Sequence, residues 1–410
     1  MRFEILRDPV WNNIRVDEPT LELVDTEVFQ RLRYVRQLGW TYLVYPGATH
    51  SRFEHALGTY HLSRRTLALL CEAEDGASIS DVDQVAARSA ALLHDVGHYP
   101  FSHALEEIGA LHHEDVARPL ITEGSVASLL SSQLGANGPA RVFDLIRGRS
   151  DSPLQGLISG SLDLDKIEYL KRDAFMCGVP YGEIDVDRLT NSFVLVEDPD
   201  SGRPTLGVRE KALSALESLL FAKYQMYRNV YWHHAVRSAT AMYKRLVEDA
   251  VRSGVVDVQS LARYTDEGLM HRLETEGPSH LLAALKERRL FKRAAEWPAA
   301  ELPGDRMEWI AIDRKRVAVA ETALAQESGL APGELLLDYP LKTQMLGLDI
   351  PVLRRSGNVE RLTGEGWIGT INLPSLSEEL YKSARWLRVF TARRTKLEPR
   401  AILDALERLS

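Results

Sequence analysis

Cysteine is scarce in this 410-residue sequence, which contains only Cys71 and Cys177. Neither residue belongs to a CxxC pair or another ligand spacing, so the sequence predicts no disulfide framework and no thiolate zinc site. Long apolar runs are also missing, since no stretch approaches 18 consecutive apolar residues and the first residues, MRFEILRDPVWNN, carry charges. We therefore expect a protein of the reducing cytoplasm that makes no contact with a membrane.

The sequence also lacks an excess of positive charge. Its formal net charge is −8, which argues against a nucleic-acid coat, so nucleic acid is not an expected partner. A local basic pocket that holds phosphate stays compatible with this charge. The content of 45% hydrophobic and 26% charged residues is typical of a globular protein, and we expect a small-molecule partner.

Histidine is concentrated in one part of the sequence. Eight of the twelve histidines lie between positions 50 and 113, where an even spread would place about two. They are His50, His55, His61, His94, His98, His103, His112 and His113. Imidazole is the commonest neutral metal ligand and the usual acid or base near neutral pH, so this crowding indicates a functional site.

The histidines fall in motifs that contain carboxylates. These motifs are RFEH at 52–55, HDVGHYPFSH at 94–103, HHED at 112–115 and DLDKIEYLKRD at 163–173. Adjacent His94 and Asp95 can reach one metal only where a helix ends, and Gly97 predicts such an end. Imidazole and carboxylate together suit Zn, Fe, Mn or Co, and they leave positions open for water and a substrate oxygen. This combination favours a hydrolase.

Periodicity predicts a mainly α protein. Helices are expected at 25–38, at 52–74, from near Ser80 to Asp95, at 163–177 and from 210 to about 249. A small β-hairpin is expected near 193–208 around a PDSG turn. Beyond Trp297 the stretches RMEWIAI, IPVLRRSG, GWIGTINL and WLRVFTARR read as short strands among helices. We predict a helical catalytic core at 1–250 and a C-terminal region at 251–410 that is helical and then α+β.

The ordered pattern H…HD…D resembles that of the HD-domain phosphohydrolases. The longer segments GATHSRFEHALG, ALLHDVGHYPFSHALE and LDLDKIEYLKRD are similar to the deoxynucleoside triphosphate triphosphohydrolases, as are DTEVFQRLRYVRQLG and YWHHAVRSA. The resemblance covers residues 1–245 and fades in the C-terminal third. It implies an HD-domain helical bundle, one divalent metal ion (Fe, Mn, Zn, Co or Mg), and hydrolysis of dNTPs to deoxynucleoside and inorganic triphosphate.

Carried over position by position, the resemblance implies that His55, His94, Asp95 and Asp165 are the metal ligands. It implies a catalytic group made of His98, His103, His113 and Glu106. His103 would donate a proton to the leaving oxygen, while His98 and His113 would either stabilise charge on the phosphate or orient the ligands. Glu106 would either orient His103 or be a solvated residue.

A substrate site follows from the same resemblance. Lys166, Tyr169 and Asp173 share one helical face by their spacing, a polar stripe where a packing face would be apolar. The family uses these positions for phosphate, the 2′ position and the 3′-hydroxyl, respectively. The other implied contacts are Arg52 and Lys223 with phosphate, Tyr231 with the deoxyribose, and Gln37 and Leu38 with the base. Lys223 stands where the family often has Arg, so it keeps the charge but cannot bind phosphate with two parallel hydrogen bonds. For Arg52 the alternative is an exposed residue at the start of a helix.

A guanine-nucleotide effector site is implied at Asp25, Gln30 and Arg33, with a charged surface face as the alternative. Glu4 and Arg7 depart from the pattern, because the mammalian SAM/HD-domain members have Lys and Asn there and Glu4 would repel a triphosphate. Regulation would then be reduced, altered or absent. The family resemblance also favours a homo-oligomer, from dimer to hexamer.

Two other functions remain open from the sequence. The first is an HD-type nucleotidase or phosphatase that acts on nucleoside monophosphates or other phosphate esters. The second is a non-catalytic scaffold that senses nucleotides or binds nucleic acid, against which the complete ligand set and the acidic charge both argue.

Overall fold

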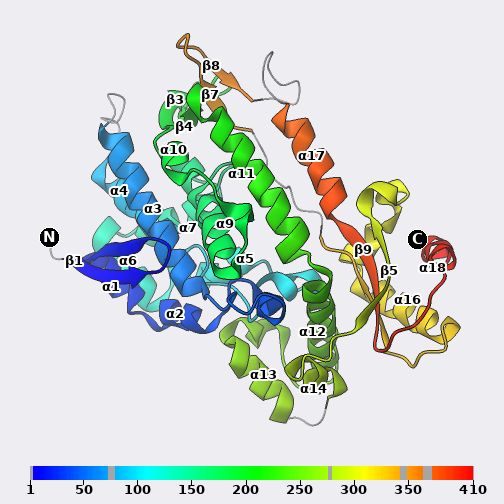
Figure 1. Ribbon diagram of the computed structural model, residues 1–410. Coiled ribbons are helices and arrows are strands. Elements are labelled where there is room, and N and C mark those ends of the chain that lie inside the picture. The colour runs from blue at the N-terminus through cyan, green and yellow to red at the C-terminus, as the bar shows by residue number, and fades with distance from the viewer. Residues whose placement is uncertain (1–2, 73–78, 276–278, 342–348, 363–371, 410) are drawn as a thin grey trace.

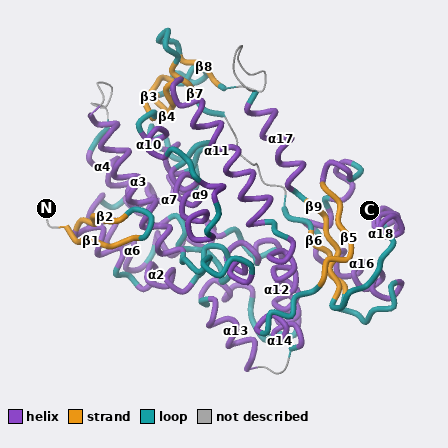
Figure 2. Tube along the Cα trace, in the orientation of Figure 1, coloured by secondary structure: helices purple, strands orange, loops and turns teal. Residues whose placement is uncertain are grey.

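The computed structural model describes residues 3–72, 79–275, 279–341, 349–362 and 372–409. Helices dominate the molecule, and short strands gather at the N-terminus, beside α10 and in the C-terminal region (Figures 1 and 2). The predicted class, mainly α with a helical core and an α+β C-terminal region, is confirmed. Among the described residues, no helix combines the length and the apolar character needed to cross a bilayer.

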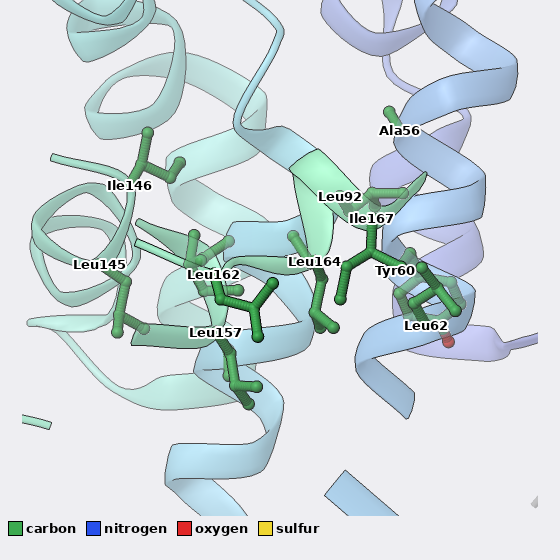
Figure 3. Close-up of a cluster of buried hydrophobic side chains, with 14 of the residues drawn as sticks. Ala56, Tyr60, Leu62, Leu92, Leu145, Ile146, Leu157, Leu162, Leu164 and Ile167 are labelled. Atoms are coloured by element: carbon green, nitrogen blue, oxygen red, sulfur yellow. The ribbon is translucent and has the colours of Figure 1, made fainter. Parts of the chain in front are cut away.

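The centre of the helical core consists of α3 (Arg52–Glu72), α4 (Asp81–Leu93) and α9 (Leu164–Cys177). Helix α3 packs against both of the others. Tyr60, Leu92 and Ile167 contribute fully buried side chains, one from each helix, and Figure 3 shows this apolar cluster. The predicted helices in these regions are confirmed, although the last two residues of the predicted 52–74 helix lie outside the described residues. These three helices also carry the predicted metal ligands.

Shorter helices surround this centre. They are α1 (Glu18–Val24), α5 (His113–Thr122), α6 (Gly124–Leu134), α7 (Gly138–Ile146), α8 (Gln155–Ile158) and α10 (Val186–Thr190). Helix α7 packs on α4, and α5 packs on α6 and α7. As a result α5, which begins at His113, is held close to the end of α4.

An N-terminal β-hairpin was not predicted from the sequence. Strand β1 (Phe3–Asp8) pairs antiparallel with β2 (Asn12–Asp17), and Asn12 turns the chain with a φ of 61°. Ile14 and Val16 are fully buried, so one face of β2 packs on α1 and α3. The hairpin is therefore fastened to the helical core.

The predicted helix at 25–38 is wrong in extent. Helix α2 covers only Glu27–Gln30, and a 3₁₀ turn over Arg31–Tyr34 follows it. Beyond the turn the backbone is extended and pairs with the segment before α3. The Gln37 amide donates to the His50 carbonyl (3.0 Å), and the Arg52 amide donates to the Val35 carbonyl (2.9 Å). These bonds pair backbone groups that a continuing helix would have paired within itself. The backbone hydrogen bonds are therefore satisfied without a longer helix.

The predicted helical stretch from 210 to 249 consists of two helices. Helix α11 (Leu213–Met226) runs into a π-helical turn over Tyr227–Tyr231, after which α12 (His234–Arg252) begins. A π-helical turn is commonly found at functional sites, since it displaces side chains from the regular helical positions. Here it places Tyr231 beside α9.

The predicted hairpin near 193–208 is confirmed as β3 (Phe193–Glu197) and β4 (Pro204–Arg209). Two strands from the C-terminal region extend this sheet. Strand β7 (Pro351–Leu353) pairs parallel with β4, and β8 (Val359–Arg361) pairs with β7, giving the order β3-β4-β7-β8. The two halves of the chain therefore share a sheet.

The second sheet of the C-terminal region has the strand order β5-β9-β6. Its strands are β5 (Lys292–Pro298), β6 (Leu335–Asp338) and β9 (Trp386–Thr391). The helices of this region are α13 (Asp266–Thr275), α14 (His280–Lys286), α15 (Trp309–Ile312), α16 (Arg314–Glu327), α17 (Leu373–Ala384) and α18 (Pro399–Arg408).

Of the strands predicted beyond Trp297, those in IPVLRRSG and WLRVFTARR are confirmed as β7 and β9. The strand predicted for RMEWIAI is wrong, because this segment forms a 3₁₀ turn followed by α15. Its residues Met307, Trp309 and Ile310 are buried whereas Ile312 is exposed, and so short an apolar run does not distinguish a strand from a helix. Most of GWIGTINL lies outside the described residues.

Candidate metal centre and active site

The four predicted metal ligands converge on one point. His55 lies in the first turn of α3, His94 and Asp95 follow the end of α4, and Asp165 lies in the first turn of α9. His55 Nε2 is 2.9 Å from Asp165 Oδ1 and 3.2 Å from His94 Nε2. His94 Nε2 is 3.4 Å from Asp95 Oδ1. His55, His94 and Asp95 offer ligand atoms that all lie within 4.8 Å of one another, so they could hold one metal ion, and Asp165 adjoins this group through its contact with His55.

The end of α4 supplies the geometry that His94 and Asp95 need. His94 caps the helix, and its Nδ1 bonds to the Ala91 carbonyl (2.9 Å), which leaves Nε2 facing the other ligands. Gly97 has a different role from the predicted helix stop. A Cβ atom there would lie 2.0 Å from the His113 carbonyl oxygen, so glycine lets α5 approach.

The donor set fits a divalent cation. Burial by itself would lower the pKa of His55, but hydrogen bonds to Asp165 and Glu168 raise that pKa to about 10. Burial opposes ionisation of Asp165, yet its hydrogen bonds to His55 and His94 hold its pKa well below the usual value. The site therefore favours positive charge. A bound divalent cation would supply that charge in place of the histidine proton, because only neutral imidazole can act as a ligand.

Arg52 contacts a ligand instead of lying exposed at the start of a helix. Its side chain is buried, with Nη1 donating to Asp95 Oδ2 (2.5 Å) and Nε donating to the Ser102 hydroxyl (3.1 Å). The other oxygen of Asp95 lies 3.0 Å from His98 Nε2. Arg52 also lines the adjacent cavity, so one guanidinium contacts both the ligand cluster and the space beside it.

The predicted catalytic group is assembled next to Asp95. The His98 ring stacks on His113 with centroids 3.8 Å apart, and the His103 ring packs edge-on against His98 at 4.7 Å. Glu106 accepts from His113 Nδ1 (2.8 Å) and lies 3.3 Å from His103 Nδ1. The structure therefore brings all four residues together, and Glu106 contacts two histidines instead of being solvated.

Charges in this group follow from burial and neighbouring residues. Burial lowers the pKa of His98 well below its usual range, and Arg52 and His113 lower it further. The ring of His98 is therefore neutral near pH 7. Burial tends to raise the pKa of Glu106, but hydrogen bonds to His103 and His113 hold it far below the usual range. Glu106 is an anion that can keep either histidine oriented.

A cavity of about 380 Å³ opens beside these groups. Its lining includes the predicted substrate residues Gln37, Leu38, Arg52, Tyr169, Asp173 and Tyr231, together with His103 and Glu106. Residues with no predicted role also line it, among them Trp40, Glu107, Tyr227 and Arg237. A mostly apolar lining with a few polar groups is typical of small-ligand sites.

The predicted phosphate lysines are not among the residues that line the cavity. Lys166 donates to the Gly160 carbonyl (2.9 Å) and pairs with Asp163, the residue that caps α9. Lys223 is buried, and burial together with the nearby Lys166 lowers its pKa to about 7.

The predicted effector residues lie on the surface near α2. Asp25 and Arg33 are exposed, and Arg33 Nε donates to Gln30 Oε1 (2.7 Å) while its guanidinium stacks 3.5 Å from the Phe53 ring centroid. In the N-terminal hairpin, Arg7 donates to Asn13. The geometry agrees equally with a charged surface face and with an effector site.

The sequence did not assign a role to residues that support the predicted ones. Glu168, within the DKIEYLKRD motif, places Oε2 2.6 Å from His55 Nδ1. His50, counted among the crowded histidines, lies 2.8 Å from Asp173. Glu168 lies on the same helix as Asp165, three residues further on, so helical spacing was the available signal.

Comparison with known proteins agrees with this arrangement. The model of the HD domain matches residues 52–165, and that of the HD associated region matches residues 184–364. An uncharacterised protein of Methanocaldococcus jannaschii is 34% identical over 341 residues, covering 82% of this chain and 69% of that protein. The deoxynucleoside triphosphate triphosphohydrolase SAMHD1 homolog of Dictyostelium discoideum is 26% identical over 373 residues, covering 83% of this chain and 68% of that protein.

A solved structure shares the fold. The crystal structure of a phosphohydrolase from Bacteroides thetaiotaomicron superposes with a TM-score of 0.74 at 22% identity, covering 96% of this chain and all of that one. The HD-domain match begins at Arg52 and ends at Asp165, so it encloses all four converging ligands. The chain therefore belongs to the HD-domain phosphohydrolases, and it is a hydrolase.

Proposed function

We propose that this protein hydrolyses deoxynucleoside triphosphates to deoxynucleoside and inorganic triphosphate. The observation that carries the proposal is the position of the four-ligand cluster beside a cavity that is lined by Tyr169, Asp173 and Tyr231. Arg52 joins the two, because it contacts Asp95 and also lines the cavity, which offers hydroxyl and carboxylate groups suited to a sugar. The similarity to the Dictyostelium triphosphohydrolase homolog supports this substrate class.

His55, His94, Asp95 and Asp165 would hold one divalent metal ion. When bound, such an ion polarises phosphate oxygen and lowers the pKa of water. In the reaction, water oxygen attacks the α-phosphorus, the bond from phosphorus to the 5′ oxygen breaks, and triphosphate leaves with the new oxygen.

His103 would supply the proton for the departing 5′ oxygen. It is the most exposed member of the catalytic group and lines the cavity, and Glu106 contacts its Nδ1. Neutral His98 and His113 lie between it and Asp95, and their single N–H groups face Asp95 and Glu106, so both would orient these carboxylates. Proton donation by a positioned histidine commonly contributes about 10²–10⁴-fold to a rate.

Sugar and base recognition would come from the other cavity residues. Asp173 is held by His50 and Tyr231 and presents a carboxylate for the 3′-hydroxyl. Tyr169 would crowd the 2′ position and so disfavour ribonucleotides, while Gln37 and Leu38 would contact the base. Arg52, Lys166 and Lys223 supply positive charge for the triphosphate.

The direct test is to incubate the purified protein with each dNTP and separate the products by ion-exchange chromatography. Deoxynucleoside and triphosphate in equal amounts are expected, with activity lost after chelation and restored by a divalent metal. Orthophosphate or pyrophosphate as the phosphate product would overturn the proposal in favour of the phosphatase function. Asp165→Asn is the matched inactive control, because it removes one ligand charge.

The same assay tests regulation. With GTP or dGTP present, stimulation that is lost in Arg33→Ala would support an effector site at Asp25, Gln30 and Arg33. An unchanged rate would mean that this surface is a charged face only. Size-exclusion chromatography with and without nucleotide tests the proposed homo-oligomer.

A further inference from the structure

Glu168 contacts the metal ligand His55 on the side away from the ligand cluster. Its side chain is completely buried, and Oε2 lies 2.6 Å from His55 Nδ1. The other ring nitrogen, Nε2, faces Asp165 and His94. A carboxylate at Nδ1 keeps the proton there, so the lone pair of Nε2 points to the ligand cluster.

The second oxygen of Glu168 is held from two directions. Trp11 Nε1 donates to Oε1 at 2.8 Å, and Arg172 Nε donates to the same oxygen at 2.8 Å. With Oε1 fixed in this way, Oε2 has one orientation toward His55.

The two donors are themselves tied to the N-terminal hairpin. Arg172 Nη1 donates to Asp8 Oδ2 (2.9 Å), and Asp8 Oδ1 accepts from the backbone amides of Val10 and Trp11 (2.8 and 2.7 Å). Asp8 therefore shapes the turn that presents Trp11 and also anchors Arg172. A continuous set of hydrogen bonds runs from the turn between β1 and β2 to a metal ligand.

Gly58 gives independent support for this arrangement. It lies on α3 one turn after His55, and a Cβ atom there would be 2.0 Å from Glu168 Oε1 and 2.8 Å from Trp11 Nε1. Any larger residue would force both groups out of place. The sequence thus leaves room on α3 for the contact between Glu168 and Trp11.

We propose that Glu168 is a positioning residue of the metal centre and that the N-terminal hairpin is part of the same unit, through Trp11 and through Asp8 and Arg172. This inference rests on the metal site of the proposed function. It implies that metal affinity is set partly by a segment outside the HD-domain match, which begins at Arg52. Displacement of the hairpin would then weaken metal binding at His55.

The test measures metal binding directly, without turnover. Metal-free protein is titrated with Co²⁺, and the visible absorption bands report both affinity and coordination. We expect Glu168→Gln to weaken Co²⁺ binding by about 10–100-fold, the usual effect of losing such a partner. The neutral amide can present its NH₂ group to Nδ1 and move the ring proton to Nε2, which blocks ligation.

Trp11→Phe keeps the ring but removes the donor, so Co²⁺ binding should weaken by about 5-fold, the factor for one lost hydrogen bond. The double variant should bind no more weakly than Glu168→Gln alone, because both changes act through one carboxylate. Additive losses would show that Trp11 acts by another route and would overturn the role of the hairpin.

The matched control is Glu321→Gln on α16. Glu321 is also a buried carboxylate, paired with Arg245 and accepting from the Leu337 amide (2.8 Å). It should lose thermal stability without losing Co²⁺ affinity. If Glu168→Gln binds Co²⁺ with wild-type affinity, the positioning role of Glu168 is wrong and the proposed metal centre is unaffected. If the wild-type protein binds no Co²⁺, both the metal centre and the positioning role are wrong.

Discussion

The Tyr231 hydroxyl donates a hydrogen bond to Asp173 across 2.7 Å and so joins the π-helical turn to α9 at the cavity wall. Burial raises the pKa of Tyr231 well above its usual value, and Asp173 raises it further, so the phenol stays a donor. Tyr231→Phe removes this bond and frees the Asp173 carboxylate to move. We expect kcat/KM for dNTPs to fall by about 5–10-fold, the factor for one hydrogen bond to a charged group.

Steady-state kinetics on Tyr231→Phe would check this prediction. Tyr224→Phe is the control, because Tyr224 lies about one helical turn before the π-helical turn, accepts a hydrogen bond from Arg228 (2.6 Å) and is not among the residues that line the cavity. Its kinetics should match the wild type. Equal losses in both variants would indicate a general packing effect and would contradict a role of Tyr231 in holding Asp173.

Replacement of His103 by alanine should affect chemistry more than binding. His103 is not one of the converging ligands, so His103→Ala should keep the wild-type metal content and nucleotide affinity. Its kcat should fall by about 10²–10⁴-fold, because the leaving 5′ oxygen loses its proton donor. Single-turnover assays with metal analysis would measure both effects.

His271→Ala provides the control, since His271 is an exposed histidine on α13. Its rate should be unchanged. Full activity in His103→Ala would remove His103 from the reaction and leave His113 as the candidate acid.

The structure brings the predicted metal ligands together, whereas parts of the surrounding fold differ from the prediction. His55, His94, Asp95 and Asp165 stand in long motifs with distinct spacing, and the structure brings all of them together. Their partners were harder to find, because the contact between Glu168 and Trp11 joins residues 157 positions apart. Periodicity along one segment contains no information on such a contact.

Errors in the fold have a similar cause. The helix predicted at 25–38 has helical periodicity, but backbone pairing of 35–37 with 50–52 overrides local preference. In RMEWIAI the buried residues are Met307, Trp309, Ile310 and Ala311, and so short an apolar run does not show the period that separates a helix from a strand. Local pattern succeeded where a cap marks the start of a helix, as Ser80 does for α4, and failed where tertiary contacts decide.

Lys223 should make substrate affinity depend on pH. Burial and Lys166 lower its pKa to about 7, whereas an unfolded lysine has a pKa of about 10.4. In the free enzyme the ammonium group is therefore lost as pH rises through about 7, and KM for dNTPs should increase. Lys223→Arg stays charged and should show a flatter KM profile between about pH 6 and pH 9.

The free energy of unfolding should change with pH in the opposite direction to substrate affinity, because it should rise where affinity falls. Between about pH 7 and pH 10 the unfolded chain holds the Lys223 proton and the folded chain does not, so this group makes the free energy of unfolding rise with pH. Lys223→Met should remove that rise. Parallel KM profiles in the wild type and Lys223→Arg would contradict the assignment of Lys223 to phosphate.

Asp338 should be important for stability and for the shape of the cavity. This buried residue of β6 accepts from Arg237 (2.6 and 2.8 Å) and Lys244 (3.1 Å), and Glu107 binds the same two cations. Asp338→Asn would leave two buried cations with one carboxylate. We expect a loss of about 3–5 kcal/mol in the free energy of unfolding, measured by urea denaturation.

Because Arg237 and Glu107 line the cavity, Asp338→Asn should also raise KM.

Burial raises the pKa of Asp338 and Glu107, but Arg237 and Lys244 lower both, that of Glu107 to about 2. The two carboxylates therefore stabilise the folded protein above about pH 4, and this contribution is lost as pH falls toward 2. On acidification the free energy of unfolding should fall less in Asp338→Asn than in the wild type. Asp249→Asn on α12, an exposed carboxylate, should change stability by less than about 0.5 kcal/mol. Arg237, Lys244 and Asp249 all lie on α12. Similar losses of stability in both variants would show that any change at this helix destabilises the protein, and not the loss of a carboxylate beside two buried cations.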